Sequence, residues 1–550
     1  MSDNHDNAPT VHPDLAIQTT SAIEEKNISA SPVDSSPTIK KDIQYLSNED
    51  LVIQSELPLL PLNGNFDRGN QQEENQLQNQ NQNQNQNQSR NITIKTKLYK
   101  RRFIPLISLS LLNIIVSWCW LSFSSISKTS SQFFSVSENS INWLSTGFLF
   151  AFFIASPASL WSLNKLGIKK SLIIASGLLI LGNWLRYLSS KLSSHSNSNT
   201  RFGILLLGQI VIGFSQPIIL SSPTRLSNTW FNEKGRITAT ALATLCNPLG
   251  GALGQLLGPI LAPEPSKIPD MILYVAIITT IICIPTLFIP SAPPLPPTTT
   301  PITNSKIDLR TLRTLFTNLS FHMVAWPFIV YVAAFNSTSS LLNQILEPYG
   351  LSEDQAGIDG AVLIVIGLLA AAIASPILDR FCTSNQKLKL IIIKGLVLII
   401  CFSYLAMIFI PLTKGLIGPA IISGFLGGSS FILLPLSLEL LVDFTYPLIN
   451  PEISSTVCWS LSQLFGGILL LIMSNLKGNK GWKSQPENTL YRSLVFQSVI
   501  CFLVAPLPLC LGYWGTGRNK RISQQEESQY EGYIQNQDQA PAETQQRSPI

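Results

Sequence analysis

Twelve apolar segments, each about twenty residues or longer, follow one another between residues 103 and 514 of this 550-residue chain. A helix rises about 1.5 Å per residue, so about twenty apolar residues cross the roughly 30 Å of hydrocarbon in a bilayer. Backbone groups inside a bilayer must bond within the protein, and a helix satisfies them. The pattern predicts an all-α membrane protein with twelve transmembrane helices. The expected spans are 103–127, 142–163, 171–190, 202–224, 237–262, 270–290, 320–346, 356–378, 388–411, 416–441, 453–475 and 491–514.

The composition excludes several classes of protein. Charged residues make up 13% of the chain, about half of their share in a soluble domain, and the net charge is only +5. The basic residues form short clusters without interleaved aromatics, so no nucleic-acid partner is expected. The eight cysteines lie in or beside apolar segments and form no metal-binding pattern with histidines. Since there is also no nucleophile–base set or phosphate loop, we expect no enzyme, no cofactor and no metal site.

The polar stretches divide the chain into five parts. The prolines of Pro290–Arg310 exclude helix and mark a linker between two six-helix halves. The N-terminal stretch contains an Asn/Gln tract, Gln76–Arg90, and its first residues form no cleaved signal sequence. We therefore expect a disordered tail (1–98), a first bundle (99–290), a linker (291–315), a second bundle (316–515) and a disordered C-terminal tail (516–550).

The basic clusters predict the orientation. Six clusters of lysine and arginine lie before the first expected span and after the second, fourth, sixth, eighth and twelfth, which predicts that both tails are cytoplasmic. Two loops depart from this rule: an acidic one near Glu439, and one with Lys477, Lys480 and Lys483 on the expected outer side. The chain is expected to be a monomer in the lipid bilayer, and its sequence does not distinguish the plasma membrane from the vacuolar membrane.

A repeat relates the two halves. The stretch "LNKLGIKKSLIIASG", Leu163–Gly177, has a weaker partner 215 residues later in Leu378–Gly395, which matches Asn164 to Asp379. The first stretch resembles the signature loop between the second and third helices of the major facilitator superfamily, over a chain region of about 100–515. That resemblance implies two bundles, rocker-switch alternating access and a cytoplasmic latch, with Asn164 in place of the family's aspartate. The expected latch residues are Asn164, Lys165, Lys169, Lys170, Asp379 and Arg380, and a merely solvated turn is the alternative.

Longer stretches in both halves carry a closer resemblance. They are "SINWLSTGF" (Ser140–Phe148), "GNWLRY" (Gly182–Tyr187), Gly208–Gly254, "SSLLNQIL" (Ser339–Leu346) and Ser423–Pro447. They resemble a fungal-type member of the feline leukaemia virus subgroup C receptor-related family. This resemblance implies transport of a small organic solute such as choline or a related amine. Haem or another organic compound, or a non-transporting nutrient receptor or sensor, are the alternatives.

The same resemblance suggests substrate-binding residues. In the choline-handling relatives, a first-helix tryptophan and a seventh-helix tyrosine hold the quaternary ammonium, with glutamines nearby. The tryptophan and the glutamines fall at Trp120, Gln216 and Gln463, but the tyrosine position holds Asn336, with Phe335 beside it. The aromatic cage is therefore incomplete in this alignment. Trp120 is otherwise explained as an interfacial tryptophan, and the two glutamines as links between helices.

Ionisable residues near the middle of the expected spans would indicate ion coupling. None is found at mid-depth, so we expect facilitated transport without obligatory proton coupling. Glu439, near the cytoplasmic end of the tenth span, is the possible coupling residue, and a helix-end ion pair is its alternative. The small residues of Asn247–Pro259 predict close helix packing in a bendable element.

Overall fold

The computed structural model describes residues 97–192, 197–295, 297, 313, 315–382, 386–409, 413, 415–445, 451–478 and 488–511. Nearly all of both expected tails and much of the expected linker lie outside these residues. Contacts divide the chain into residues 1–92 and 93–550, and every described residue belongs to the second unit.

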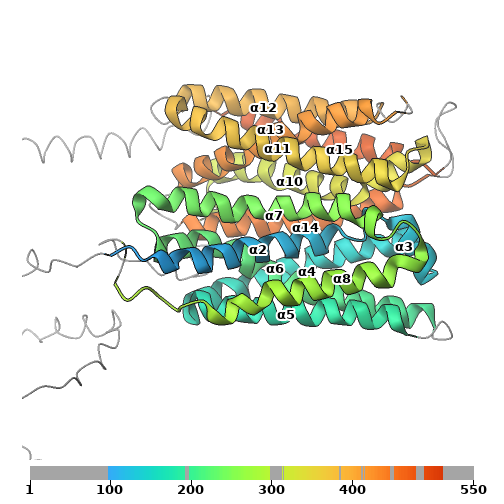
Figure 1. Cartoon of the computed structure of the whole chain (residues 1–550). Coiled ribbons are helices and arrows are strands. Elements are labelled where there is room, and N and C mark those ends of the chain that lie inside the picture. Colours follow the sequence, from blue (N-terminus) through green and yellow to red (C-terminus); the bar gives the residue numbers. More distant parts are fainter. Residues whose placement is uncertain are drawn as a thin grey trace, which may run out of the picture. The chain divides into compact units, whose positions relative to one another are not determined.

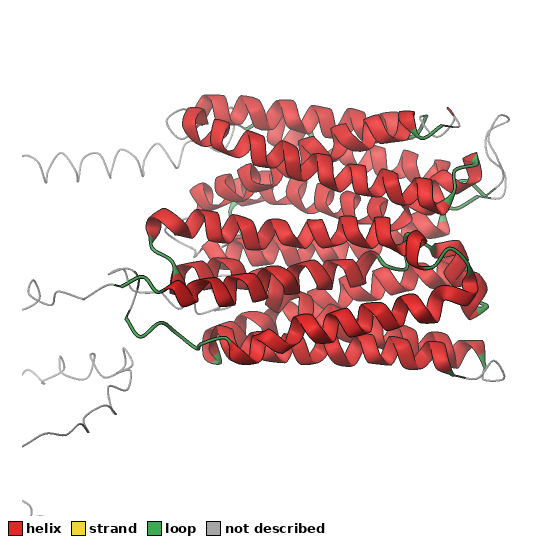
Figure 2. Cartoon of the chain, viewed as in Figure 1, coloured by secondary structure: helices red, strands yellow, loops and turns green. Residues whose placement is uncertain are grey.

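The described residues are helical almost throughout, and they contain no strand (Figure 2). Twelve long helices account for most of them. These are α2 (Phe103–Leu121), α4 (Glu138–Lys165), α5 (Gly167–Lys191), α6 (Ser198–Trp230), α7 (Glu233–Leu261), α8 (Ile268–Cys283), α10 (Leu319–Leu346), α11 (Glu353–Cys382), α12 (Gln386–Met407), α13 (Ile417–Thr445), α14 (Pro451–Asn475) and α15 (Tyr491–Val504). Short helical pieces are η1 (Lys100–Arg102), α3 (Ser127–Phe134), η2 (Pro265–Lys267), η3 (Ile284–Phe288), η4 (Glu347–Tyr349) and α16 (Pro506–Leu509).

Eleven of the described helical segments are long and apolar enough to cross a membrane. The long helix that does not reach this threshold is α7, whose sequence contains Thr240, Thr244, Asn247 and Gln255 among glycines and alanines. α7 packs against both α2 and α11, so much of its surface faces protein instead of lipid. The expected all-α, multi-span membrane fold is confirmed, with α7 as the least apolar of the expected twelve spans.

The long helices run side by side in two groups (Figure 1). In the first half, α2 packs on α7 and α5 packs on α6; in the second half, α11 and α12 both pack on α13. The halves meet where α7 contacts α11 and where α4 contacts α14. We call the face where α2 begins and α4 ends the tail face, and the opposite face the far face.

Small residues let helices approach closely, as the glycines of Asn247–Pro259 predicted. A Cβ added to Gly250 of α7 would lie 1.9 Å from the carbonyl oxygen of Ile114 in α2. In the second half, a Cβ at Gly427 of α13 would lie 1.8 Å from the carbonyl oxygen of Leu363 in α11. No other residue type fits these two crossings, so they fix the distance between neighbouring helices.

The first helix ends earlier than expected. The predicted span reaches residue 127, whereas α2 ends at Leu121 and is followed by a turn and then by α3. The hydroxyl group of Ser122 donates to the carbonyl of Cys119, and that of Ser125 donates to the carbonyl of Gly254. Serine side chains compete with the backbone for such groups, which favours a turn over a continued helix.

Candidate functional site

A cavity of about 860 Å³ lies between the two halves. It extends from mid-depth, near Trp120 and Gly251, to the tail-face ends of the helices, near Asn164 and Arg225. Its lining is mainly apolar and aromatic, with scattered hydroxyl and amide groups. Cavities of this size and composition bind small organic molecules.

Trp120 lines the cavity from α2 and does not lie on the lipid surface. It is 8% exposed, and its ring stacks on Phe148 of α4, with centroids 6.3 Å apart and an interplanar angle of 16°. Its indole Nε1 is buried without a hydrogen-bond partner among the described residues. Trp120 therefore contributes part of its aromatic surface to the cavity lining.

Gln216 lines the same cavity from α6, and its side-chain Oε1 is also buried without a described partner. The next residue is Pro217, which has no N–H and so leaves the carbonyl of Gly213 without its usual intrahelical bond. This local defect in α6 lies at the level of the cavity. A buried amide oxygen without a partner is costly, and a hydroxyl or ammonium group of a ligand would satisfy it.

Asn336 and Gln463 also line the cavity, and they bind each other across α10 and α14. The Nδ2 of Asn336 donates to the Oε1 of Gln463 at 3.0 Å. The Nδ2 lies 3.4 Å from the position that a Cβ on Gly466 would occupy, so the amide packs closely against α14. The pair connects two helices of the second half, which matches the linking role that was the alternative for Gln463.

Several aromatic cavity residues were not proposed as binding residues from the sequence. Tyr331, Phe335, Phe431 and Trp459 all line the cavity. Tyr331 and Phe335 are four residues apart on α10, and Trp459 is four residues before Gln463 on α14. Residues at this spacing share a helix face, so the spacing was a usable signal.

The expected latch residues lie at the tail face. Arg225 of α6 donates to the side-chain oxygen of Asn164 at the end of α4, so this contact lies within the first half. Lys165, Lys170 and Arg380 are exposed, and Lys169 is half-buried. The side chain of Asp379 lies outside the described residues.

Glu439 lies near the tail-face end of α13 and pairs with Lys389 of α12. The Nζ of Lys389 is 2.8 Å from the Oε1 of Glu439. The Glu439 side chain is 60% exposed, whereas the Lys389 side chain is buried. The contact therefore lies within the second half and at its edge, away from the cavity lining.

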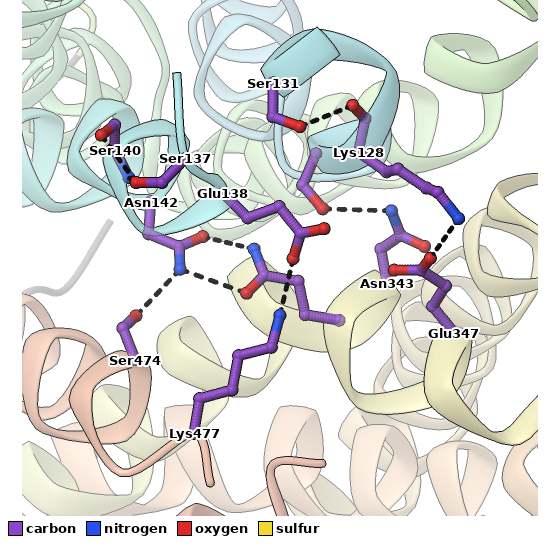
Figure 3. Close-up of polar contacts among 12 residues, drawn as sticks. Lys128, Ser131, Ser137, Glu138, Ser140, Asn142, Asn343, Glu347, Ser474 and Lys477 are labelled. Atoms are coloured by element: carbon purple, nitrogen blue, oxygen red, sulfur yellow. Dashed lines mark hydrogen bonds and ion pairs between the residues drawn. The ribbon is translucent and has the colours of Figure 1, made fainter. Parts of the chain in front are cut away.

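At the far face, polar contacts join the two halves (Figure 3). The amides of Asn142 in α4 and Gln344 in α10 exchange two hydrogen bonds of 2.7 and 3.3 Å, and Asn142 also donates to Ser474 at 2.9 Å. Lys477 pairs with Glu138 at 2.7 Å. We call these contacts, together with those of Lys128, Asn343, Glu347 and Glu353 described next, the far-face gate.

Glu353, at the start of α11, receives four hydrogen bonds. Its carboxylate accepts from the backbone N–H groups of Lys128 and Thr129, from the Thr129 hydroxyl at 2.5 Å, and from Asn343 at 3.0 Å. The first three donors belong to α3, whose N-terminal N–H groups have no partner within the helix. A carboxylate of the second half thus caps a helix of the first half.

Lys128 of α3 adds an ion pair to the gate, with its Nζ 2.5 Å from the Oε1 of Glu347. The hydrogen bond and the charge of Glu347 raise the pKa of Lys128 above its ordinary value of 10.5. The lysine therefore stays charged at neutral pH, and its charge is lost as the pH rises above 10.5. The gate also accounts for Lys477, which departs from the orientation rule because it binds the other half. Lys480 and Lys483 lie outside the described residues.

Two ionisable residues are buried inside the helices, and one of them, Asp359, was not noticed in the sequence. Asp359 of α11 is fully buried, and one carboxylate oxygen accepts from Ser423 of α13 at 3.0 Å, while the other has no described partner. Arg186 of α5 is fully buried, with its guanidinium 2.7 Å from the Ser122 hydroxyl and over the ring of Phe123. Both lie within two turns of the far-face ends of their helices. Among the described residues, no group of three or more acidic, histidine or cysteine side chains could hold a metal.

Comparisons with known proteins agree with this architecture. The sequence profile of the Major Facilitator Superfamily matches residues 103–446, more than half of the chain. Among solved structures, the D-xylose-proton symporter has a TM-score of 0.56 at 14% identity, covering 74% of this chain and 96% of that one. The nucleoside transporter NupG has a TM-score of 0.56 at 13% identity, covering 75% and 99%. At these identities the likeness shows the fold.

Curated relatives are similar over most of their length. The chain is 28% identical to "Solute carrier family 49 member A3" of Danio rerio, covering 69% of this chain and 79% of that protein. It is 29% identical to "Choline/ethanolamine transporter FLVCR1" of Felis catus, covering 70% and 69%, and 26% identical to "Choline/ethanolamine transporter FLVCR2" of Homo sapiens, covering 70% and 74%. The expected resemblance to feline leukaemia virus subgroup C receptor-related proteins is confirmed, and so is the expectation that the chain is no enzyme. The chain belongs to the Major Facilitator Superfamily and is a multi-pass membrane transporter of organic solutes.

Proposed function

We propose that this transporter carries a small cationic amine of the choline class across the membrane by alternating access, without obligatory proton coupling. The main support for this proposal is the cavity wall at mid-depth. Trp120 contributes an aromatic ring there, and Gln216 contributes an amide oxygen without a described partner. A cation over an aromatic face gains about 0.5–2 kcal/mol, depending on desolvation. A hydroxyl group on the same solute would donate to Gln216. The relatives named choline/ethanolamine transporters support this choice of substrate.

The structure supports alternating access by the placement of its contacts. The far-face gate joins the halves, while the cavity extends to their tail-face ends. This arrangement is the state in which solute would exchange with the tail side. In the opposite state the far-face gate must break and the tail-face ends must meet, and there Asn164, Lys165, Lys169, Lys170, Asp379 and Arg380 would form or flank the latch.

The orientation follows from the basic clusters. We propose that the tail face is cytoplasmic, that both tails share that compartment and that the transporter acts as a monomer. In this orientation the cavity is open to the cytoplasm. The plasma membrane and the vacuolar membrane both fit this arrangement.

Arg225 and Arg236 are the charged residues of the described cavity lining, and they favour a second candidate. Both lie near the tail-face mouth, about 13 Å or more along the helices from the level of Gln216. A solute with acidic groups, such as haem with its propionates, would pair with arginines. The arginines lie too far from Trp120 and Gln216 to contact a small solute held there, so we place the choline-class amine first.

Uptake of radiolabelled choline in a cell that lacks its own choline uptake tests this function. The parent chain should restore uptake, and Trp120→Ala should reduce it severalfold at equal surface expression. Trp143→Ala provides a matched control, because Trp143 is exposed on the outside of the same half. Absent uptake with the parent, or equal uptake with Trp120→Ala, would reject the assignment and leave a different solute or a receptor function.

A further inference from the structure

The end of α6 and the start of α7 form a polar mouth on the cavity. On α6 the polar lining residues recur at intervals of three and four, which places them on one face of the helix. On α7 they recur every four residues, which again places them on one face. We call the following residues the vestibule: Ser221, Thr224, Arg225, Asn228, Arg236, Thr240 and Thr244. The Thr240 hydroxyl donates to Ser227 at 2.7 Å, which joins its two sides.

The vestibule is positively charged. Arg225 and Arg236 are its charged residues, and the described lining of the whole cavity contains no aspartate or glutamate. The Nε of Arg236 is buried without a hydrogen-bond partner among the described residues. A charged group that is partly removed from water is costly unless another group bonds to it or neutralises it. The vestibule therefore favours an anionic ligand.

Arg225 is held at the mouth by Asn164. Its guanidinium donates to the side-chain oxygen of Asn164 at the end of α4. This asparagine stands at the loop position where the resemblance to the superfamily implies an aspartate. Because asparagine is uncharged, the contact orients Arg225 without neutralising it. The chain thus keeps a positive charge beside a position where a carboxylate would have reduced it.

A phosphate group matches this arrangement better than a carboxylate does. At neutral pH a phosphate monoester carries about 1.5 to 2 negative charges and three strong acceptor oxygens. Arginine binds such oxygens in bidentate pairs, and the hydroxyl and amide groups of the vestibule are donors for the remaining oxygens. A carboxylate has one charge and two oxygens, so it would leave more of the charge and more of the donors unmatched.

We propose that the vestibule binds a phosphate group, supplied by inorganic phosphate or by a phosphorylated small molecule, and that the bound phosphate inhibits transport. The two arginines lie about 13 Å or more along the helices from the level of Gln216, so this site is separate from the proposed amine site. In the opposite state the tail-face ends must meet, and the vestibule would be closed. A ligand that binds only one state stabilises that state. The inhibition rests on the proposed function, whereas the phosphate site does not.

Calorimetry on the purified full-length chain tests the site without transport. Inorganic phosphate, glycerol 3-phosphate and glycerol would be titrated at equal ionic strength. A phosphate compound should bind, glycerol should not, and Arg236→Gln should weaken the binding at least about 10-fold because it removes a charge-assisted contact. Binding of inorganic phosphate alone would identify the free ion as the ligand, and tighter binding of glycerol 3-phosphate would identify a phosphorylated organic molecule.

Further variants separate the vestibule from a general effect of charge. Asn164→Asp places a carboxylate beside Arg225 and should weaken phosphate binding. Arg236→Lys keeps the charge but loses the planar fork, so it should lose less affinity than Arg236→Gln, and it tests the same point if the glutamine variant does not fold. Arg101→Gln is the matched control, because Arg101 is exposed at the same tail face outside the cavity lining. It should leave phosphate binding unchanged.

Choline uptake into proteoliposomes tests the inhibition. Saturating phosphate on both sides of the membrane, compared with chloride at equal ionic strength, should lower uptake by the wild-type chain severalfold. The ratio of the two rates should approach one in Arg236→Gln and should keep its wild-type value in Arg101→Gln.

The outcomes are distinct. The inference is wrong if neither phosphate compound binds, if Arg236→Gln and Arg101→Gln change the binding equally, or if choline uptake occurs and saturating phosphate leaves it unchanged. Phosphate binding that depends on Arg236, in a chain that takes up no choline, would support the vestibule site and reject the proposed transport.

Discussion

Replacing Glu353 with alanine should open the far face. The carboxylate receives four hydrogen bonds, and three of them come from α3 of the other half. Loss of a helix cap costs about 0.5–2 kcal/mol, and hydrogen bonds to a charged group are worth about 1.5–3 kcal/mol. Because the side chain is half-buried and partly screened by water, we take about 2 kcal/mol for the whole cap.

A change of about 2 kcal/mol shifts a two-state equilibrium roughly 30-fold toward the state with an open far face. Glu353→Gln keeps one oxygen acceptor and should give about half of that free-energy change. The closed-gate population can be measured as a distance distribution by electron spin resonance, with spin labels on the exposed residues Gln132 of α3 and Asp354 of α11. The accessible native cysteines would be replaced by serine in all samples.

Glu264→Gln is the matched control for this measurement. Glu264 also lies at the far face, but its carboxylate accepts from Ser266 within the first half. The control should leave the distances unchanged, whereas Glu353→Ala should add a longer population. If Glu353→Ala matches the parent chain, or if the control shifts the distances equally, Glu353 does not hold the halves together.

Three further predictions concern the latch, the coupling and the packing. Asp379→Ala should change the ratio of the two alternating-access conformations more than it changes substrate affinity. If the labelling of cysteines placed at the tail face does not change, the loop is only a solvated turn. Uptake should persist when a protonophore collapses the proton gradient at clamped membrane potential, and Asp359→Asn should retain it; a loss in either case would indicate proton coupling through Asp359 or Glu439. Gly250→Ala should lower the melting temperature by several degrees because it collides with the backbone of α2, while Gly177→Ala, with open space around it, should not; equal melting temperatures would contradict the close crossing.

Hydropathy predicted the helices well because a helix that crosses the bilayer must be apolar over one long, continuous stretch of sequence. It was least informative for α7, where contacts with α2 and α11 replace lipid contact. Hydropathy also placed the end of α2 too late. The hydroxyls of Ser122 and Ser125 bind single backbone carbonyls there, and a hydropathy average over about twenty residues does not detect such local contacts.

The gate could not be predicted in this way. Glu353 and the N-terminus of α3 are more than two hundred residues apart in the chain, and only the three-dimensional fold shows that they meet. Asp359 was not identified from the sequence because it lies near the end of a span, where an acidic residue is expected to contact water. In the fold it is completely buried.

Counterflow in proteoliposomes tests the central claim most directly. Purified chain carrying Lys128→Cys and Glu347→Cys, two residues that are paired across the far-face gate, would be reconstituted with unlabelled choline inside and radiolabelled choline outside. Before cross-linking, the label should accumulate; a short thiol cross-linker should stop the exchange, and a cleavable form should restore it on reduction. The parent chain, treated in the same way, should be unaffected. Choline counterflow that continues with the gate cross-linked, or that never occurs, would contradict alternating access of a choline-class amine through this cavity.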